Sequence, residues 1–308
     1  AVWRPCAMTP FTSNPIFYTH CSVLTTRPIR WFLLLALCLC ALGARAQTVA
    51  LVTDVKGAVV FAPERSGKPV ALLSELASGA DILLDNGASL SFVYLQSGTE
   101  FELRGPAHIT LGATAPQSVA GAGATLRSSV VAAETARLQT TNGRVVLGGM
   151  VMRGPGMDRF KLLEPTGKVL GTRPTFAWTR PPGAGSVQFE LHDEGNDKLL
   201  LSTTVQGNQL VLDDSLQLQP GVNYVWRLAL QVPGANSLVR SSYFSLSSPQ
   251  ERERMEALRP GPQAPFSDRL IYASLLEQGR FLSEAHKLWL QLAQERPDLP
   301  ELRTLANK

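Results

Sequence analysis

Few residues of this sequence combine the types and spacing that chemistry requires. The histidines His108, His192 and His286 are far apart in the chain, and none is followed by a second metal ligand at helical or loop spacing. The acidic stretch HDEGNDK, residues 192–198, could offer oxygen ligands to calcium, but it lacks the twelve-residue calcium-loop pattern. We therefore expect surface or rim positions for the histidines and a solvated hairpin tip for the acidic stretch.

Glycine and serine patterns give no catalytic motif either. The stretch GGMVMRGPGM, residues 148–157, lacks the Gly-Lys-Ser/Thr ending of a phosphate loop, and no helix is predicted after it. It is interpreted as an interdomain joint. No serine lies in a Gly-x-Ser-x-Gly motif. We predict that the protein is not an enzyme and that it uses no cofactor and no metal.

Two tryptophans allow two interpretations. Trp178 and Trp226 could form a carbohydrate-binding platform, because large rings stack on sugars, or they could fill a core. Each alternates with neighbours of the opposite polarity in a strand-like stretch. This pattern favours core packing, in which each ring can bury about 150–250 Å².

A predicted signal peptide occupies residues 23–46. Two arginines precede an uncharged apolar run of 14 residues at 31–44, and Ala-Arg-Ala follows, so we expect cleavage between Ala46 and Gln47. The run is shorter than the about 20 residues that a membrane span needs. We therefore predict a periplasmic or secreted protein with no transmembrane span in the mature chain.

The first 46 residues leave one alternative open. A lipoprotein signal could end at Cys38 or Cys40, but leucine precedes each cysteine where that signal prefers a small residue. Residues 1–22 have no pattern of their own, and we interpret them as possible upstream read-through. The whole leader is thus assigned to residues 1–46.

Removing the leader changes the charge and cysteine arguments. It holds four of the 29 Lys and Arg residues and no acid, so 25 basic residues face 25 acidic ones and the net charge of the mature chain is zero. This disfavours a nucleic-acid partner. All four cysteines also lie in the leader, which excludes thiol catalysis and disulfides in the mature chain. Its 262 residues are enough for two or three domains.

Residues 47–157 predict a first β domain. Leu90, Phe92 and Tyr94 alternate with neighbours on the opposite face of a predicted strand, and the turn pairs at 86–87 and 97–98 separate such strands into hairpins. The stretch 112–129 is rich in small residues and has no large apolar anchors, so we predict a mobile loop there.

This first segment resembles the FecR domain. The resemblance lies in Gly-Ala-Val at 57–59, Gly-Ala-Asp-Ile at 79–82 and Gly-Thr-Glu-Phe-Glu-Leu at 98–103. It implies a β domain outside the cytoplasm, which in the best-known form of the family belongs to a regulator of an extracytoplasmic sigma factor. Because the predicted signal peptide follows almost directly on the predicted start, we expect no cytoplasmic anti-sigma segment and, at most, a signalling role outside the membrane.

Residues 158–248 resemble a fibronectin type III-like or immunoglobulin-like sandwich. The phrases PTFAW at 174–178 and LQPGVNYVW at 218–226 carry the resemblance, and prolines and glycines separate short alternating strands throughout. The resemblance implies a fold and carries no function with it.

The end of the chain predicts helices. Residues 249–266 begin as a charged helix and end as a proline-rich linker, and residues 267–308 resemble one tetratricopeptide unit with a turn one residue longer than usual. Ser267 and Ser283 are the predicted helix caps, and Gly279 is the predicted stop.

Two apolar stripes on these helices form the candidate partner surface. Its residues are Leu270, Ile271, Leu275, Ala285, Trp289 and Leu292. A single unit of this kind cannot bury both its faces, since such repeats normally stack. The helices therefore either bind a partner or dock on the sandwich, and the sequence leaves both possibilities open.

Taken together, the sequence predicts a mainly β chain: a FecR-like β domain, an immunoglobulin or fibronectin type III-like sandwich and a C-terminal helical hairpin. The predicted function is that of a noncatalytic interaction or scaffold protein of the cell envelope, which would include a role in envelope signalling. The alternative is a module that binds cell-wall glycan or polysaccharide. The expected partner is accordingly an envelope protein or a cell-wall component.

Overall fold

The computed structural model describes residues 47–62, 67–121, 125–128, 131, 160–231 and 237–307. The predicted signal peptide, the four cysteines and the glycine-rich stretch 148–157 lie outside these residues. The described part is mainly β with helices at the C-terminal end, as the sequence predicts.

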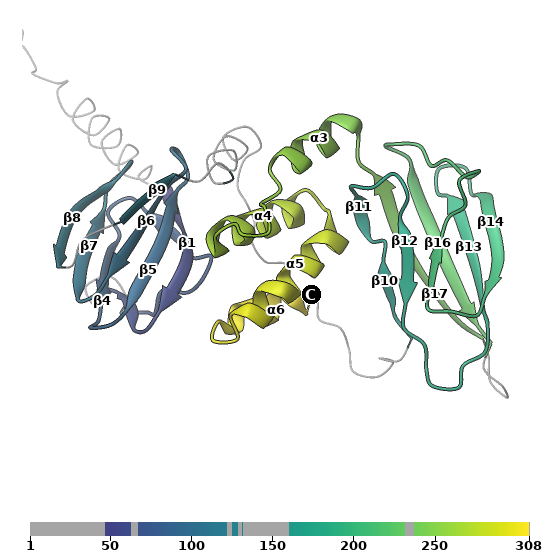
Figure 1. The fold of residues 1–308 in the computed structure, drawn as a ribbon, viewed down its shortest axis with the longest axis horizontal. Helices are drawn as coiled ribbons and strands as arrows, with labels where there is room; N and C mark the ends of the chain where they lie inside the picture. The colour runs from purple at the N-terminus through teal and green to yellow at the C-terminus, as the bar shows by residue number, and fades with distance from the viewer. Residues whose placement is uncertain are drawn as a thin grey trace, which may run out of the picture. The chain divides into compact units, whose positions relative to one another are not determined.

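The first β domain consists of two sheets (Figure 1). One has the strand order β3-β1-β5-β6-β9 and the other the order β2-β4-β7-β8. The strands are β1 (Thr48–Lys56), β2 (Val59–Phe61), β3 (Glu75–Ala77), β4 (Asp81–Leu84), β5 (Ser89–Tyr94), β6 (Thr99–Arg104), β7 (Ala107–Leu111), β8 (Pro116–Gly121) and β9 (Thr125–Ser128).

The core of this domain follows the predicted alternation. Leu90, Phe92 and Tyr94 are fully buried, and the rings of Phe92 and Tyr94 both contact Phe101, with centroids 5.7 and 5.4 Å away. Burial raises the pKa of Tyr94 to about 12. The tight turns at Gly87 and Gly98 have φ of 76° and 68°, a backbone conformation that glycine adopts without steric cost.

The loop predicted at 112–129 is wrong, because strands β8 and β9 form there. Among the residues that the structure describes, each is the last strand of its sheet, since β8 pairs there only with β7 and β9 only with β6. An edge strand is bound to the sheet by backbone hydrogen bonds on one side. It therefore forms without the large apolar residues that identify a central strand in the sequence.

The second β domain is a sandwich of a three-stranded sheet, β10-β12-β15, and a five-stranded sheet, β11-β17-β16-β13-β14. The two sheets share one apolar core, so the β-sandwich that the sequence predicts for this segment is present. Its strands are β10 (Leu162–Glu164), β11 (Gly167–Val169), β12 (Thr175–Trp178), β13 (Val187–Asp193), β14 (Lys198–Val205), β15 (Gln209–Val211), β16 (Asn223–Leu230) and β17 (Leu238–Leu246).

The two motifs that predict the sandwich have structural roles in its core. Trp178 and Trp226 are 1% and 0% exposed, and Trp226 Nε1 donates to the Pro165 carbonyl at 3.0 Å. Tyr224 fastens the preceding turn, because its hydroxyl accepts from Gln219 N at 2.7 Å. Core packing of both tryptophans is therefore confirmed, and a carbohydrate platform at these two residues is excluded.

Four helices follow the sandwich: α3 (Pro249–Ala257), α4 (Phe266–Gln278), α5 (Leu282–Glu295) and α6 (Pro300–Ala306). α3 begins with a capping box of Ser248 and Glu251, and α4 ends at Gly279 as predicted. The predicted caps are wrong, since Pro265 and Phe281 occupy the cap positions and Ser267 and Ser283 lie in the first turns. None of the helices described is long and apolar enough to cross a membrane.

The core role of Trp226 is testable by substitution. We expect Trp226→Ala to lower the free energy of unfolding by about 3–5 kcal/mol, the range for a large ring removed from a core. Denaturant unfolding followed by circular dichroism measures this loss. The matched control is Tyr243→Ala on the same sheet, where the ring is 55% exposed, and its effect should stay within about 0.5 kcal/mol. Equal effects of the two substitutions would contradict the assignment.

Candidate interaction site in the helical tail

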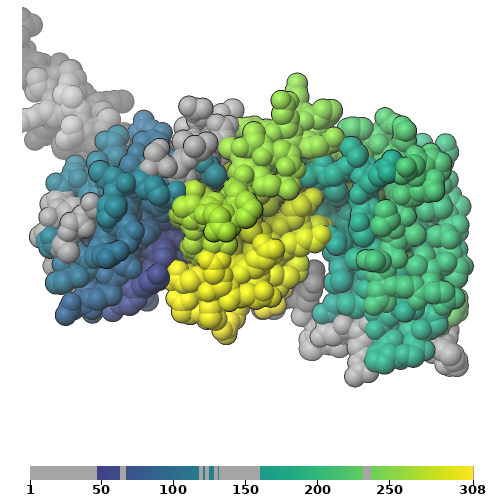
Figure 2. Space-filling view, viewed as in Figure 1, coloured from purple at the N-terminus to yellow at the C-terminus, as the bar shows by residue number. Residues whose placement is uncertain are grey.

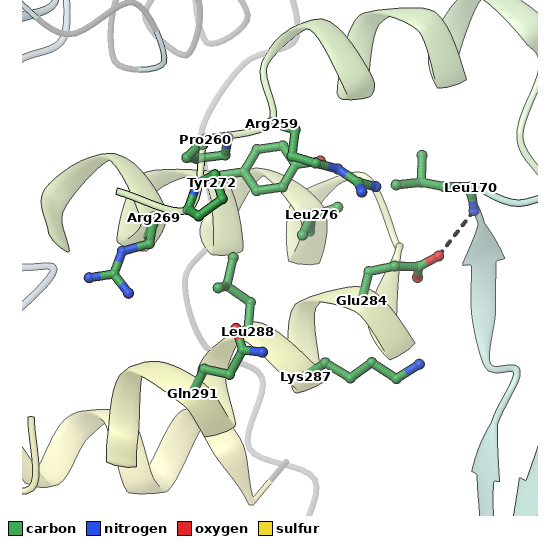
Figure 3. Close-up of a pocket in the computed structure, with 12 residues that line it drawn as sticks. Leu170, Arg259, Pro260, Arg269, Tyr272, Leu276, Glu284, Lys287, Leu288 and Gln291 are labelled. Carbon is green, nitrogen blue, oxygen red and sulfur yellow. Dashed lines mark hydrogen bonds between the residues drawn. The ribbon is translucent and has the colours of Figure 1, made fainter. Parts of the chain in front are cut away.

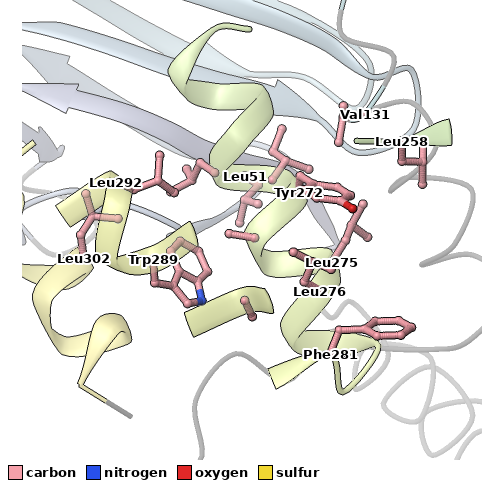
Figure 4. Close-up of a cluster of buried hydrophobic side chains, with 14 of the residues drawn as sticks. Leu51, Val131, Leu258, Tyr272, Leu275, Leu276, Phe281, Trp289, Leu292 and Leu302 are labelled. Carbon is pink, nitrogen blue, oxygen red and sulfur yellow. The ribbon is translucent and has the colours of Figure 1, made fainter. Parts of the chain in front are cut away.

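The candidate partner surface lies inside the protein. Helices α4, α5 and α6, here called the tail, contribute to one apolar cluster together with Leu51, Leu72 and Val93 of the first β domain and Leu170 of the sandwich. Figure 4 shows Leu51 beside tail residues such as Tyr272 and Leu292. The six predicted surface residues, Leu270, Ile271, Leu275, Ala285, Trp289 and Leu292, are between 0% and 4% exposed. The prediction of an exposed partner surface at these residues is therefore wrong. The tail docks on its own chain, and it does so on both β domains.

The reason lies in the composition of α4. Residues 270–276 are all buried, so this helix has no solvent-facing side over two turns. A helix that is buried all round needs neighbours on every side. α5 differs, because its buried residues Ala285, Trp289 and Leu292 form one stripe at three- and four-residue spacing. α5 covers one side of α4, and strand β1 of the first β domain contacts α4 as well (Figure 2).

A polar network joins the first turn of α4 to the first β domain. Arg127 on β9 donates from Nε to Glu100 Oε2 at 2.8 Å and from Nη1 to Asp268 Oδ2 at 3.0 Å. Glu100 is only 6% exposed and also accepts from Thr53 Oγ1 at 2.9 Å and from Ser267 Oγ at 3.1 Å. Burial alone would lower the pKa of the Arg127 guanidinium, but the bonds to Asp268 and Glu100 outweigh it and raise that pKa.

A second polar contact lies at the end of α5. Arg296 donates to Asp54 Oδ1 on β1 at 2.7 Å and to Asp298 Oδ2 at 2.8 Å, and its guanidinium lies over the Phe266 ring, 5.3 Å from the centroid. The hydrogen bonds to Asp298 and then Asp54 raise the pKa of Arg296. The tail is thus bound to the first β domain by two charged contacts with apolar packing as well.

On the sandwich side, the turn between α4 and α5 covers the free edge of strand β11. Three alternate backbone N–H groups of this strand and its flanks point to the same edge, and all three find acceptors in the turn or the start of α5. The bonds run from Thr166 N to Ser283 Oγ at 3.1 Å, from Lys168 N to the Arg280 carbonyl at 2.6 Å, and from Leu170 N to Glu284 Oε1 at 3.1 Å.

The turn approaches β11 so closely that a glycine is required there. Gly167 has φ of 69°, and a Cβ at this position would collide with the carbonyl oxygen of Arg280. Arg280 itself has φ of 67°. The α4–α5 turn, which is one residue longer than in the tetratricopeptide pattern, thus supplies the acceptor for Lys168 N. Lys168 Nζ in turn donates to Glu251 on α3 at 2.6 Å, which lowers the pKa of that carboxyl.

A pocket of about 360 Å³ lies beside this contact, between the linker at 259–262 and helices α4 and α5 (Figure 3). Glu284, whose bond to Leu170 N is drawn in the figure, lines it together with three cationic residues. Each cation already has a carboxylate partner. The pairs are Arg259 with Glu256 at 2.8 Å, Arg269 with Glu295 at 2.6 Å, and Lys287 with Glu164 at 2.5 Å. The charged residues that line this pocket therefore give no indication of an ionic ligand.

The remaining residues considered for chemistry lie apart. His108 on β7 and His286 on α5 are exposed as expected, whereas His192 on β13 is only 9% exposed, between Glu190 and Asp197. The acidic stretch 192–198 contains the expected hairpin tip, in which Asp193 Oδ1 accepts from Gly195 N at 2.9 Å. Across the described residues, no group of three or more His, Cys, Asp or Glu side chains could hold a metal ion.

Known proteins share only a distant likeness with this chain. No protein-family model matches the chain, and no curated protein matches it. Among solved structures, murine CRIg shares 13% identity over 29% of this chain and 94% of that chain, with a TM-score of 0.20. A two-domain fibronectin type III segment of chicken tenascin shares 16% over 66% and 86%, with a TM-score of 0.22. A beta-1,2-glucanase from Parabacteroides distasonis shares 9% over 81% and 48%, with a TM-score of 0.23.

The close approach at Gly167 predicts a stability difference between two glycines. Gly167→Ala and Gly183→Ala both place alanine at positive φ, which costs about 1–2 kcal/mol, but only Gly167 has atoms of the turn next to the new Cβ. We expect Gly167→Ala to cost at least about 1 kcal/mol more, because the turn must move away from Lys168 N and leave it unsatisfied. Urea unfolding of both variants tests this. Equal losses would show that the turn yields without strain.

The network at Arg127 predicts a loss on substitution and a partial rescue. Arg127→Met leaves Glu100 and Asp268 without their shared cation, and we expect a cost of about 3 kcal/mol, at the lower end of the range for a broken buried pair because Arg127 is partly exposed. Arg127→Met/Glu100→Gln should recover part of the loss. Arg104→Met, in an exposed pair with Glu102, is the control and should cost less than about 1 kcal/mol. The same cost at both arginines would contradict the assignment.

Proposed function

We propose that this protein is a noncatalytic interaction or scaffold protein of the cell envelope whose first domain is of the FecR type. The observation that carries the proposal is the tail, which joins two β domains through one apolar cluster and two polar contacts instead of offering its own apolar face to a partner. A chain built in this way presents two β modules together. This is the property that a scaffold needs, and it would also serve envelope signalling.

The FecR assignment is supported by the glycines that carry the resemblance. Gly57, Gly79 and Gly98 have φ of 72°, 76° and 68°, so each occupies a turn that favours glycine. Gly57 precedes β2, Gly79 precedes β4, and Gly98 precedes β6. Gly98 lies in the β5–β6 hairpin, whereas Gly57 and Gly79 lie where the chain passes from one sheet to the other. The spacing of these glycines along the chain therefore reflects the turns of a two-sheet β domain.

The envelope assignment rests on the sequence. The basic, apolar and small-residue pattern of residues 23–46 is typical of a signal peptide, and the chain after residue 46 has no cysteine. We propose a periplasmic or secreted location after cleavage between Ala46 and Gln47. The partner would be an envelope protein.

Glycan binding is the second candidate function, and one residue favours it. Tyr243 on β17 is 55% exposed on the outer face of the five-stranded sheet, opposite Val225 in the strand register and beside polar residues of the next row, including Arg227. An exposed aromatic ring next to hydrogen-bonding side chains can stack on a sugar. This face, and not the two buried tryptophans, is where a polysaccharide would bind.

The decisive experiment produces the tagged full chain in a bacterial host, fractionates the cells and cross-links the envelope with and without prior peptidoglycan digestion. We expect a mature protein that begins at Gln47 by intact mass, in the envelope fraction, and a specific cross-linked protein that persists after digestion. The Trp226→Ala variant controls for folding, and it should lose the partner.

The two candidate functions separate in the digestion arm. Retention on purified peptidoglycan that Tyr243→Ala removes without changing the melting temperature would favour the glycan-binding module over the scaffold. An uncleaved or lipid-modified chain would overturn the predicted processing. A chain that stays in the cytoplasmic fraction would overturn the envelope proposal altogether.

A further inference from the structure

The two edge strands of the five-stranded sheet of the sandwich differ in whether another part of the chain covers them. At one edge, β11 is covered by the turn between α4 and α5. At the other edge lies β14, and in the described part of the chain no strand pairs with its outer side. β14 spans eight residues, Lys198–Val205, which is longer than the average strand of about 5–6 residues. A long open edge strand is a ready template for another strand.

The side chains of β14 also leave the edge of the core incompletely covered. Leu200, Leu201 and Val205 pack against the core of the sandwich but are only partly buried. Leu199 is 50% exposed on the outer face. A strand added beside β14 would cover these apolar side chains and would satisfy the outward backbone groups of β14 at the same time.

The devices that protect edge strands are concentrated at one end of β14. A register shift occurs opposite Leu191 and His192, next to the charged Lys198. Beyond it, residues 201–205 pair with β13 in unbroken register, and residues 199–205 contain no charge and no proline. Five regular, uncharged residues with an open edge therefore remain.

We propose that this edge pairs with β14 of a second copy of the chain, antiparallel and about a two-fold axis at Thr203. The sequence from Leu201 to Val205 is self-complementary in this register. Leu201 lies opposite Val205 of the second copy, Ser202 opposite Thr204, and Thr203 opposite itself. In this register each side chain directed to the core lies opposite another that is directed to the core, so the two sheets can form one continuous sheet across the axis. No like charges lie opposite one another. This inference is independent of the proposed function.

Sedimentation velocity of residues 46–308, which form a compact unit, tests the proposal. We expect a concentration-dependent dimer. In the double variant Ser202→Lys/Thr204→Lys, the new lysines of the two copies lie opposite one another, and we expect a monomer because like charges repel. We expect a monomer for the double variant Ser202→Glu/Thr204→Glu as well, for the same reason. An equimolar mixture of the two variants should dimerise again, because each lysine then faces a glutamate. Thr175→Lys/Gln209→Lys, at exposed sites of the other sheet, is the control with the same charge change and should still dimerise.

A single cysteine locates the axis, since residues 46–308 contain none. Thr203→Cys should form a disulfide-linked dimer under mild oxidation, because residues paired across strands have Cα atoms close enough for a disulfide. Thr175→Cys should not. Wild-type chain that stays monomeric up to high micromolar concentration would overturn the proposal and leave the edge to an extended segment of another protein. A dimer that persists in the lysine variant, or a mixture that stays monomeric, would overturn it equally.

Discussion

The arrangement of this chain depends on a helix that cannot face water. α4 has seven consecutive buried residues at 270–276, and one neighbouring helix covers only part of such a surface. Leu51 and Val93 of the first β domain belong to the same apolar cluster, as do Met255 and Leu258 at the end of α3 and Leu170 of the sandwich. Burial of apolar surface, at about 25 cal/mol per Å², is the main force that holds the tail in place. The docking of the tail follows from the composition of α4.

Apolar burial is not directional, and polar contacts fix the position in which the tail docks. Arg127 of the first β domain binds Asp268 of the tail as well as Glu100, and Arg296 of the tail binds Asp54 of the first β domain. The N–H groups along β11 bind acceptors in and next to the α4–α5 turn, which fits one arrangement of that turn. Partly buried ion pairs contribute little net stability, because desolvation offsets much of the attraction. Misplaced, however, each of these groups would be left without a partner. We interpret the contacts as the features that select one docked arrangement among the many that apolar burial would allow.

The sequence predicts those parts of the structure that local patterns determine. Alternation identifies the buried faces around Leu90 and Phe92, and the phrase around Tyr224 and Trp226 identifies the sandwich, because period two and turn residues are local properties. The tail residues such as Trp289 are recognised as apolar stripes for the same reason. What covers these stripes is not predictable in this way, because it includes Leu51 and Val93 on strands far earlier in the chain.

The two serines show this limit most clearly. Ser267 and Ser283 have the residue type and position of helix caps, yet their hydroxyl groups bind Glu100, 167 residues away, and Thr166, 117 residues away. A cap rule considers only the next three residues. Likewise, the edge strands β8 and β9 are held by backbone pairing, which leaves little trace in side-chain composition. Local rules are reliable here until a side chain or strand is used by a distant part of the chain.

The docking of the tail also sets an order of events during biosynthesis. Arg296 binds Asp54 across 242 residues, so the face of β1 that receives the tail is made long before the helices that cover it. Closing so long a loop is not costly at equilibrium, since each doubling of loop length adds only about 0.6 kcal/mol. During synthesis, however, Leu51 of the first domain stays exposed until nearly the whole chain has emerged from the ribosome. Until then the nascent chain carries an apolar surface that is prone to aggregate.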